Sequence, residues 1–197
     1  ICRVAGDQPY LVGVEALLRW RFNNQPVAPN EFIPVLEESR EIVRVGEWVL
    51  REACCQVRRW QLAGQSQLYC AVNLSIRQLQ QPGFTALLAR VLRETGLPPA
   101  SLLLEITETL LMQDSELMMG ALHEIAALGV RLALDDFGTG YCSLGYLKRY
   151  PLHVLKVDRS FIAAAPDDAD SVAISRAVIG LGQSLGLAVV AEGVEHP

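Results

Sequence analysis

Short apolar runs alternate along this chain with longer stretches in which apolar residues recur at helical spacing. The runs of strand length cover residues 1–5, 11–19, 68–72, 102–106, 131–134, 153–157 and 187–191. Helical spacing covers residues 31–38, 41–63, 84–95, 115–128, 143–149 and 170–185. A regular alternation of strand and helix predicts an α/β fold, with a parallel sheet covered by helices.

The number of strands selects among α/β architectures. Seven candidate strands are too many for a sandwich of 197 residues. A TIM-like (β/α)8 barrel, with one strand still to come, fits better. The length and the hydrophobic content of 51% fit one domain with a sizeable core, or most of a larger one.

Composition excludes several classes of function. A net charge of −5 disfavours binding to nucleic-acid polymers. The five cysteines form no Cys-x-x-Cys pattern, and the adjacent Cys54 and Cys55 are poorly placed to bridge, which predicts reduced thiols and a cytoplasmic location. Three scattered histidines disfavour a zinc site. No signal peptide is visible, and residues 177–191 are too short and interrupted to span a membrane, although an anchor elsewhere in a longer protein stays open.

One apolar run ends in two adjacent acids, Asp135 and Asp136, and the glycines Gly138 and Gly140 follow. Two ionised carboxylates repel each other, and desolvation adds to that cost. A divalent cation or strong hydrogen-bond donors relieve the repulsion, and glycines let the backbone turn close to a ligand. A single pair of this kind is more simply interpreted as a strand end with an Asp-rich turn. The recurrence of the pattern favours a ligand site instead.

Polar residues stand at the C-terminal ends of the apolar strands along the whole chain. They are Glu15, Asn73, Glu105, Asp135 with Asp136, Lys156 with Asp158, and Glu192. In a (β/α)8 barrel these strand ends converge on the face that carries active sites. Oxygen ligands favour Mg²⁺ or Mn²⁺ over zinc. Shared ligation by Asp135 would allow two ions about 3.5–4 Å apart, an arrangement that cleaves phosphodiesters.

Two cationic side chains accompany these acids. Lys156 can hold a water molecule or the negative charge that develops during the reaction. Arg19 shares a strand face with Glu15 and Leu17 by the period-two rule and can pair with a phosphate oxygen.

At these residues the chain resembles a known family. Residues 15–20, which read Glu-Ala-Leu-Leu-Arg-Trp, are similar to the signature of the EAL domain family of cyclic di-GMP phosphodiesterases. The similarity continues, in order, through residues 73–75, 105–108, 135–144, 156–158 and 192–195. It covers essentially the whole chain, so that residues 1–197 are identified as a single EAL domain. By this resemblance the domain is incomplete at both ends, lacking the start of strand 1 and the eighth strand.

The resemblance implies a TIM-like barrel whose first strand runs antiparallel to the rest. It implies hydrolysis of cyclic di-GMP to linear pGpG in bacterial second-messenger signalling, with Mg²⁺ or Mn²⁺ in a two-metal site. Residue by residue, it implies one metal held by four ligands and a second held by three, with Asp158 nearby as a further metal or substrate contact. The first set is Glu15, Asn73, Glu105 and Asp135, and the second is Asp135, Asp136 and Glu192.

The resemblance also implies catalytic roles and partners. Lys156 orients the attacking water, Glu192 is the general base, and Arg19 contacts a substrate phosphate. Glu108 braces the loop after Asp136, which links the metal site to a dimer interface in the family. A homodimer is therefore expected, and such domains are often fused to sensory or GGDEF domains.

Two alternatives to an active enzyme stay open. One is a catalytically inactive receptor for cyclic di-GMP, and the other is a protein-interaction module that binds no nucleotide. Receptors typically lose metal ligands or the loop motif, whereas this chain keeps both, with Cys142 in place of a usual serine in the loop. The active phosphodiesterase is therefore the favoured interpretation.

Overall fold

A computed structural model describes residues 1–5, 8–111, 116–138, 144–164 and 168–194 of this protein. It divides into two compact units, one of residues 1–104 with 127–130 and the other of residues 105–126 with 131–197. Strand β7 (Leu102–Thr107) and helix α6 (Glu116–Ala127) run from one unit into the other. Within the described residues, no helix combines the length and apolar content needed to cross a membrane.

The first unit contains three pairs of strands. The first strand, β1 (Cys2–Ala5), pairs antiparallel with β2 (Gln8–Leu11) in a separate two-stranded sheet. Strand β3 (Gly13–Ala16) pairs in parallel with β6 (Tyr69–Asn73). Strands β4 (Trp20–Phe22) and β5 (Gln25–Val27) form a hairpin.

The strand that was expected over residues 11–19 is shorter than predicted. It ends at Ala16, so Leu17 and Arg19 do not continue the face of Glu15. The chain turns instead into the β4–β5 hairpin, where Asn23 and Asn24 have φ angles of 47° and 64°. Consecutive residues with positive φ form the turn type that suits a two-residue hairpin, and asparagine tolerates that conformation.

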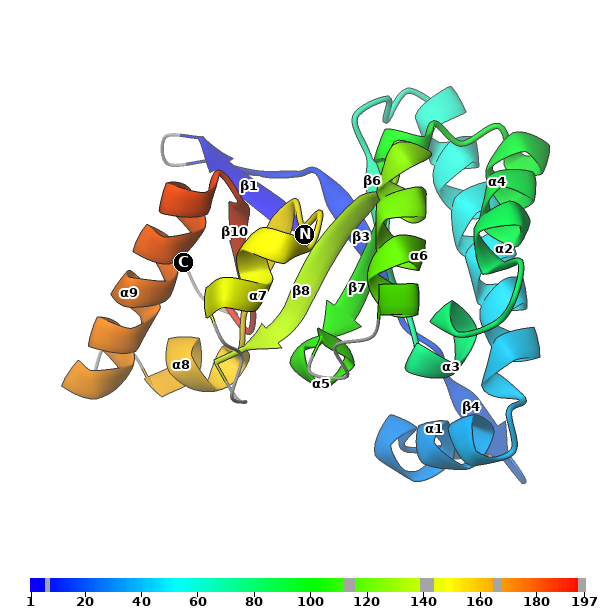
Figure 1. The fold of residues 1–197 in the computed structure, drawn as a ribbon, viewed down its shortest axis with the longest axis horizontal. Helices are drawn as coiled ribbons and strands as arrows, with labels where there is room; N and C mark the ends of the chain where they lie inside the picture. The colour runs from blue at the N-terminus through cyan, green and yellow to red at the C-terminus, as the bar shows by residue number, and fades with distance from the viewer. Residues whose placement is uncertain (6–7, 112–115, 139–143, 165–167, 195–197) are drawn as a thin grey trace. The chain divides into compact units, whose positions relative to one another are not determined.

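The helices of the first unit pack through their apolar faces. They are α1 (Pro29–Glu38), α2 (Ile42–Leu62), α3 (Ile76–Leu79) and α4 (Phe84–Thr95), with a short 3₁₀ turn at Pro99–Ser101. Helices α2 and α4 lie side by side (Figure 1). Leu50 and Val57 of α2 and Leu88 and Val91 of α4 are almost fully buried. Helix α4 ends as the sequence predicts, because Gly96 adopts the left-handed conformation just after it.

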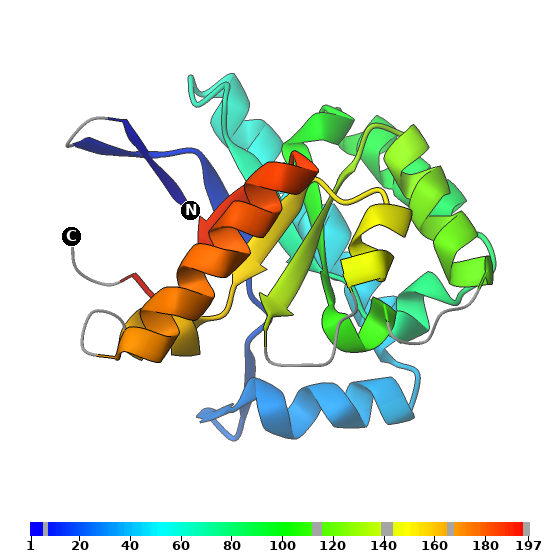
Figure 2. The ribbon, with the colours of Figure 1, turned by 60° about the vertical axis from the view of Figure 1, so that its left-hand side comes forward.

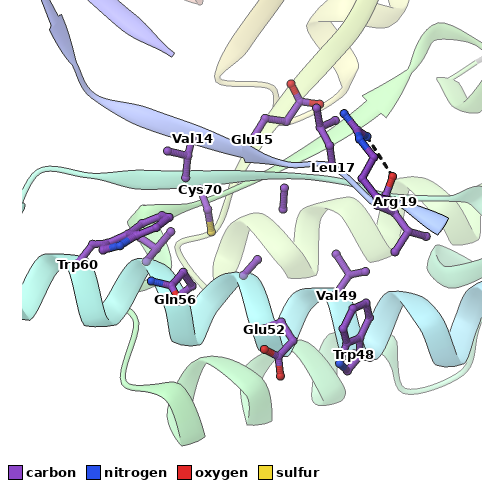
Figure 3. A pocket seen from close by; sticks show the side chains of 14 residues that line it. Val14, Glu15, Leu17, Arg19, Trp48, Val49, Glu52, Gln56, Trp60 and Cys70 are labelled. Atoms are coloured by element: carbon purple, nitrogen blue, oxygen red, sulfur yellow. Dashed lines mark hydrogen bonds between the residues drawn. The ribbon is translucent and has the colours of Figure 1, made fainter. Parts of the chain in front are cut away.

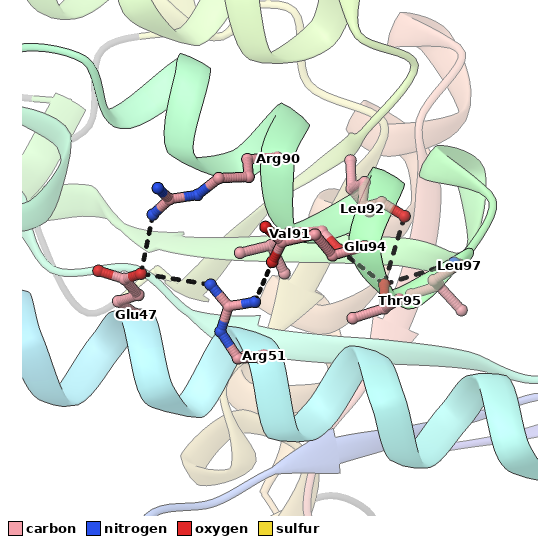
Figure 4. Close-up of polar contacts among 8 residues, drawn as sticks. All are labelled: Glu47, Arg51, Arg90, Val91, Leu92, Glu94, Thr95 and Leu97. Carbon is pink, nitrogen blue, oxygen red and sulfur yellow. Dashed lines mark hydrogen bonds and ion pairs between the residues drawn. The ribbon is translucent and has the colours of Figure 1, made fainter.

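Exposed charges join the outer sides of α2 and α4 (Figure 4). Glu47 accepts from Arg51 at 3.4 Å and from Arg90 at 3.0 Å, and Arg51 also pairs with Glu94. The hydrogen bond to Arg51 lowers the pKa of the Glu94 carboxyl. Because these side chains are largely solvated, the network contributes little to stability.

The second unit is built on three parallel strands. Strand β9 (Val154–Val157) pairs with β8 (Arg131–Phe137) and with β10 (Ala188–Ala191). Leu132, Leu134 and Leu155 on these strands are fully buried. Besides most of α6, its described helices are α5 (Glu108–Leu111), α7 (Leu144–Arg149), α8 (Arg159–Ala164) and α9 (Ala169–Leu185). The longest, α9, runs along β9 and β10 (Figure 2).

The predicted alternation of strands and long helices is confirmed. The sequence prediction missed the helices α3, α5 and α8, which have four to six residues and are too short to show helical periodicity. It also ended the central strand at Leu134, whereas β8 extends to Phe137. The organisation as a single domain stays a prediction.

Two helical glycines should respond in opposite ways to replacement by alanine. A Cβ added at Gly46 of α2 would overlap the side chain of Gln78, whereas nothing lies within 4 Å of one added at Gly120 of α6. Gln78 is buried and its Oε1 accepts from the amide of Ser75 at 3.1 Å in the capping box of α3. We expect Gly46→Ala to destabilise the fold by about 1–3 kcal/mol because the site becomes overpacked.

The matched variant Gly120→Ala should stabilise the protein by about 0.5–1 kcal/mol, since alanine costs less backbone entropy in a helix. Urea unfolding measures both changes. Equal effects of the same sign would contradict the packing assigned to Gly46.

Candidate metal centre

The two adjacent acids of the central strand lie in a β-bulge. In the pairing of β8 with β9, Leu134 is opposite Leu155 and Phe137 is opposite Val157. Asp135 and Asp136 therefore both lie opposite the single residue Lys156. Asp136 has a φ angle of 53°, in the left-handed region that few residues other than glycine adopt. Because a bulge re-aims side chains, both acids can serve one site, although a regular strand would send neighbours to opposite faces.

Asp135, Asp136 and Glu192 form a compact group of carboxylates. One oxygen atom from each can be chosen so that all three lie within 4.8 Å of one another. Glu192 follows β10 directly, and its amide donates to the carbonyl of Val157 at 3.1 Å, which continues the ladder between β9 and β10. The C-terminal ends of parallel strands thus supply all three acids, as the sequence predicts.

Lys156 is the buried counter-charge of this group. Its Nζ lies 2.8 Å from Glu105, 2.9 Å from Asp135 and 2.7 Å from Glu192. The side chain is 3% exposed. Burial alone would lower the pKa of Lys156, but the attraction of Glu105 and the other carboxylates outweighs it and raises the pKa. Lys156 therefore stays charged at neutral pH.

Asp136 lies at the more exposed side of the cluster and has a raised pKa. Desolvation is the main cause, followed by repulsion from Asp135, Asp158 and Glu192. The lysine therefore offsets only part of the negative charge at this place. A bound cation would relieve the remaining repulsion.

Glu108 holds the backbone just after the bulge. It is the first residue of α5, it is buried, and its Oε1 accepts from the amide of Gly138 at 2.8 Å. This contact lies at the start of the loop that Glu108 is predicted to brace. The rest of that loop, including Cys142, lies outside the described residues.

Asp158 makes a structural contact that the sequence did not predict. Its Oδ1 accepts from the amide of Ser160 at 2.9 Å and from the Ser160 hydroxyl. These hydrogen bonds lower the pKa of Asp158 and fix the start of α8. Asp158 lies close enough to Asp136 to raise its pKa, but it is outside the group of three carboxylates.

In the first unit, Glu15 and Asn73 lie together. Asn73 Nδ2 donates to Glu15 Oε1 at 3.0 Å, between the neighbouring strands β3 and β6. The carboxylate of Glu15 points away from α2 (Figure 3). These two strand ends therefore bring their side chains together within this unit.

Arg19 lies beyond the end of β3 and is exposed. Its Nη1 donates to the carbonyl of Leu18 at 3.0 Å. It also borders a cavity of about 520 Å³ between β3 and α2, which is lined mainly by apolar side chains such as Trp48 and Trp60 (Figure 3).

The donor set of the second unit fits a hard divalent cation. Carboxylate oxygens are the ligands that such ions prefer, and three of them converge here. The described residues bring no histidine or cysteine into this group. Asp135, Asp136 and Glu192 are therefore the residues that would hold the metal.

Fold and centre together define an α/β protein with an acidic, oxygen-donor site at the ends of parallel strands. The family model described as "EAL domain" matches residues 4–197. The chain therefore belongs to the EAL domain family. This confirms the family and the TIM-like α/β fold class that the sequence predicts.

Relatives with names and structures support the assignment. The chain is 44% identical over 186 residues to the "Bifunctional diguanylate cyclase/cyclic di-GMP phosphodiesterase MucR" of Pseudomonas aeruginosa, covering 94% of this chain and 27% of that protein. It is 43% identical to the "Cyclic di-GMP phosphodiesterase NbdA" of the same organism, covering 93% of this chain and 24% of that protein. The chain thus spans about a quarter of the length of these relatives.

A solved structure described as "PaMucR Phosphodiesterase, c-di-GMP complex" superposes with a TM-score of 0.88 at 44% identity. The match covers 94% of this chain and 75% of that one. The EAL domain of Mycobacterium smegmatis DcpA matches with a TM-score of 0.72 at 43% identity, over 77% of this chain and 68% of that one.

Sequence reasoning missed the residues that surround the acids. Phe161 and Arg159 of α8 contact the backbone beside Asp136 and beside Glu192 through Gly138 and Gly193. The available signal was a glycine one or two positions after each acid, which indicates a close approach of another element.

Removing the counter-charge should destabilise the second unit strongly. We expect Lys156→Met to lower the free energy of unfolding by about 3–5 kcal/mol, because three carboxylates lose their buried partner. Lys148→Met, at an exposed position of α7, is the control and should change little. Denaturant unfolding near pH 7 without metal measures both, and equal stability of the two variants would contradict the role given to Lys156.

Proposed function

We propose that this chain is the hydrolytic domain of a cyclic di-GMP phosphodiesterase, which releases linear pGpG in bacterial second-messenger signalling. The observation that carries the proposal is the convergence of Asp135, Asp136 and Glu192 within 4.8 Å of one another, beside the buried Lys156. The names of MucR and NbdA support the same activity for this family member.

The proposed cofactor is Mg²⁺ or Mn²⁺ in a two-metal site. Asp135 would be a ligand of both ions, Glu15, Asn73 and Glu105 would complete the first ligand set, and Asp136 and Glu192 would complete the second. Asp158 would be a further metal or substrate contact near the second ligand set. When bound, such ions lower the pKa of a water molecule and stabilise the leaving oxygen.

The side chains of this chain supply the remaining steps. Lys156, fixed by three carboxylates, donates a hydrogen bond that orients the attacking water. Glu192 has a side chain 25% exposed and takes up the proton of that water as general base. Arg19 pairs with a phosphate oxygen of the substrate. Glu108 keeps the backbone after the bulge in place through Gly138.

The wider setting of the domain is part of the same proposal. We place it in the cytoplasm as a homodimer, fused to sensory or GGDEF domains in a longer protein. The free thiols of Cys54 and Cys70 agree with a reducing compartment.

Release of pGpG tests the function directly. The 197-residue chain and a longer version that extends through an eighth strand should be assayed with Mg²⁺, Mn²⁺, Ca²⁺ or EDTA. We expect hydrolysis with Mg²⁺ or Mn²⁺, none with EDTA, and inhibition by Ca²⁺, which prefers longer bonds and more ligands. Nucleotide binding without hydrolysis in the longer protein would favour the receptor alternative, and absence of binding would favour an interaction module.

Asp135→Asn should separate catalysis from binding. The amide keeps the shape and one acceptor oxygen but loses the charge that offsets the repulsion between two cations. We expect turnover to fall by a factor of at least about 10². Binding of cyclic di-GMP should be retained but weakened. Calorimetry beside the pGpG assay measures both quantities.

Asp170→Asn, in the first turn of α9, is the matched control and should behave as wild type. Normal turnover of Asp135→Asn would remove Asp135 from the shared metal position.

A further inference from the structure

Helix α8 begins directly after the strand that carries Lys156. Only Asp158 separates β9 from α8, and its Oδ1 accepts from the amide of Ser160 at 2.9 Å. The short helix is therefore tied to the middle strand of the acidic centre. Helix α9 packs against α8, and the hydroxyl of Ser175 on α9 contacts the carbonyl of Phe161 at 3.5 Å.

Helix α8 touches the backbone that follows Asp135 and Asp136. A Cβ placed on Gly138 would lie 2.7 Å from Cε2 and 3.1 Å from Cζ of Phe161. The ring thus lies flush against a backbone that Glu108 also holds, through the hydrogen bond to the Gly138 amide. The segment two residues after Asp136 is therefore restrained by α5 and by α8.

Helix α8 also touches the backbone that follows Glu192. A Cβ placed on Gly193 would lie 2.7 Å from Cβ and 3.5 Å from Cα of Arg159. Gly138 and Gly193 both have positive φ angles, 104° and 71°, so both backbone shape and close approach require glycine. Helix α8 thus contacts the ends of both strands that supply the three carboxylates, β8 and β10.

We infer that Phe161 and Arg159 are positioning residues that set the spacing between the Asp135–Asp136 pair and Glu192. Phe161 contacts the backbone after Asp136 through its ring, and Arg159 contacts the backbone after Glu192 through its Cβ. They act on the site by fixing the positions of the ends of β8 and β10. This inference rests on the proposed function, because the spacing matters only if these carboxylates share metal ions. Partners beyond the ligands themselves typically affect metal affinity by about 10–100-fold when they are changed.

Binding of Mn²⁺ without nucleotide tests the inference apart from catalysis. Free Mn²⁺ can be followed by electron paramagnetic resonance while the protein is titrated. We expect Phe161→Ala to weaken Mn²⁺ binding by about 10-fold or more, and Phe161→Leu, which keeps an apolar contact, to do so less. Val178→Ala, at a buried position of α9, is the control and should lower the melting temperature without changing Mn²⁺ affinity.

Two variants of Arg159 isolate the contact made by its Cβ, because both remove the guanidinium charge. Arg159→Ala keeps the Cβ that meets Gly193, whereas Arg159→Gly removes it. We expect weaker Mn²⁺ binding in the glycine variant than in the alanine variant. Equal binding in these two, together with wild-type affinity in both Phe161 variants, would overturn the inference while leaving the proposed function intact. A wild-type protein that binds no Mn²⁺ would overturn the proposed function, and the inference with it.

Discussion

The buried ammonium group of Lys156 is the interaction on which the acidic centre depends. It lies within 2.9 Å of carboxylates from Glu105, Asp135 and Glu192, which would otherwise repel one another in a poorly solvated place. The compensation is uneven across the centre. Glu105 is fully buried beside the lysine, whereas Asp136 lies further out and keeps a raised pKa. The lysine thus offsets part of the negative charge at its own end of the centre, and the carboxylates at the outer end still favour a cation.

The bulge in β8 explains how neighbouring acids can share that outer end. A regular strand points residues i and i+1 to opposite faces, so adjacent acids would be divided between the two faces of the sheet. Two residues opposite Lys156, one of them with positive φ, remove this limit. The asparagine–glutamate contact between β6 and β3 needs no such device, because Glu15 and Asn73 come from separate strands.

The sequence predicted what depends on periodicity and on strand ends. Long helices and apolar strands follow from their spacing, and Asp135, Asp136 and Glu192 lie together because parallel strands present their C-terminal ends at one edge. The bulge was not predictable, because it depends on a register between β8 and β9 that no local pattern specifies. Asp158 was interpreted as a metal or substrate contact, since a capping contact with Ser160 becomes visible only once α8 is known to start there. The Asn23–Asn24 turn carried a signal for the hairpin that the long expected strand obscured.

The elements around the centre act mainly on its backbone, and this has a chemical reason. Glu108 accepts a hydrogen bond from Gly138, and α8 packs against Gly138 and Gly193 through carbon atoms. A donor placed on the ligand carboxylates would compete with a cation for their lone pairs, whereas a restraint on the neighbouring backbone fixes their position without that cost. Lys156 does contact the carboxylates directly, and its charge offsets the repulsion among them. Separating charge compensation from positioning in this way lets the same carboxylates be held in place and still bind metal.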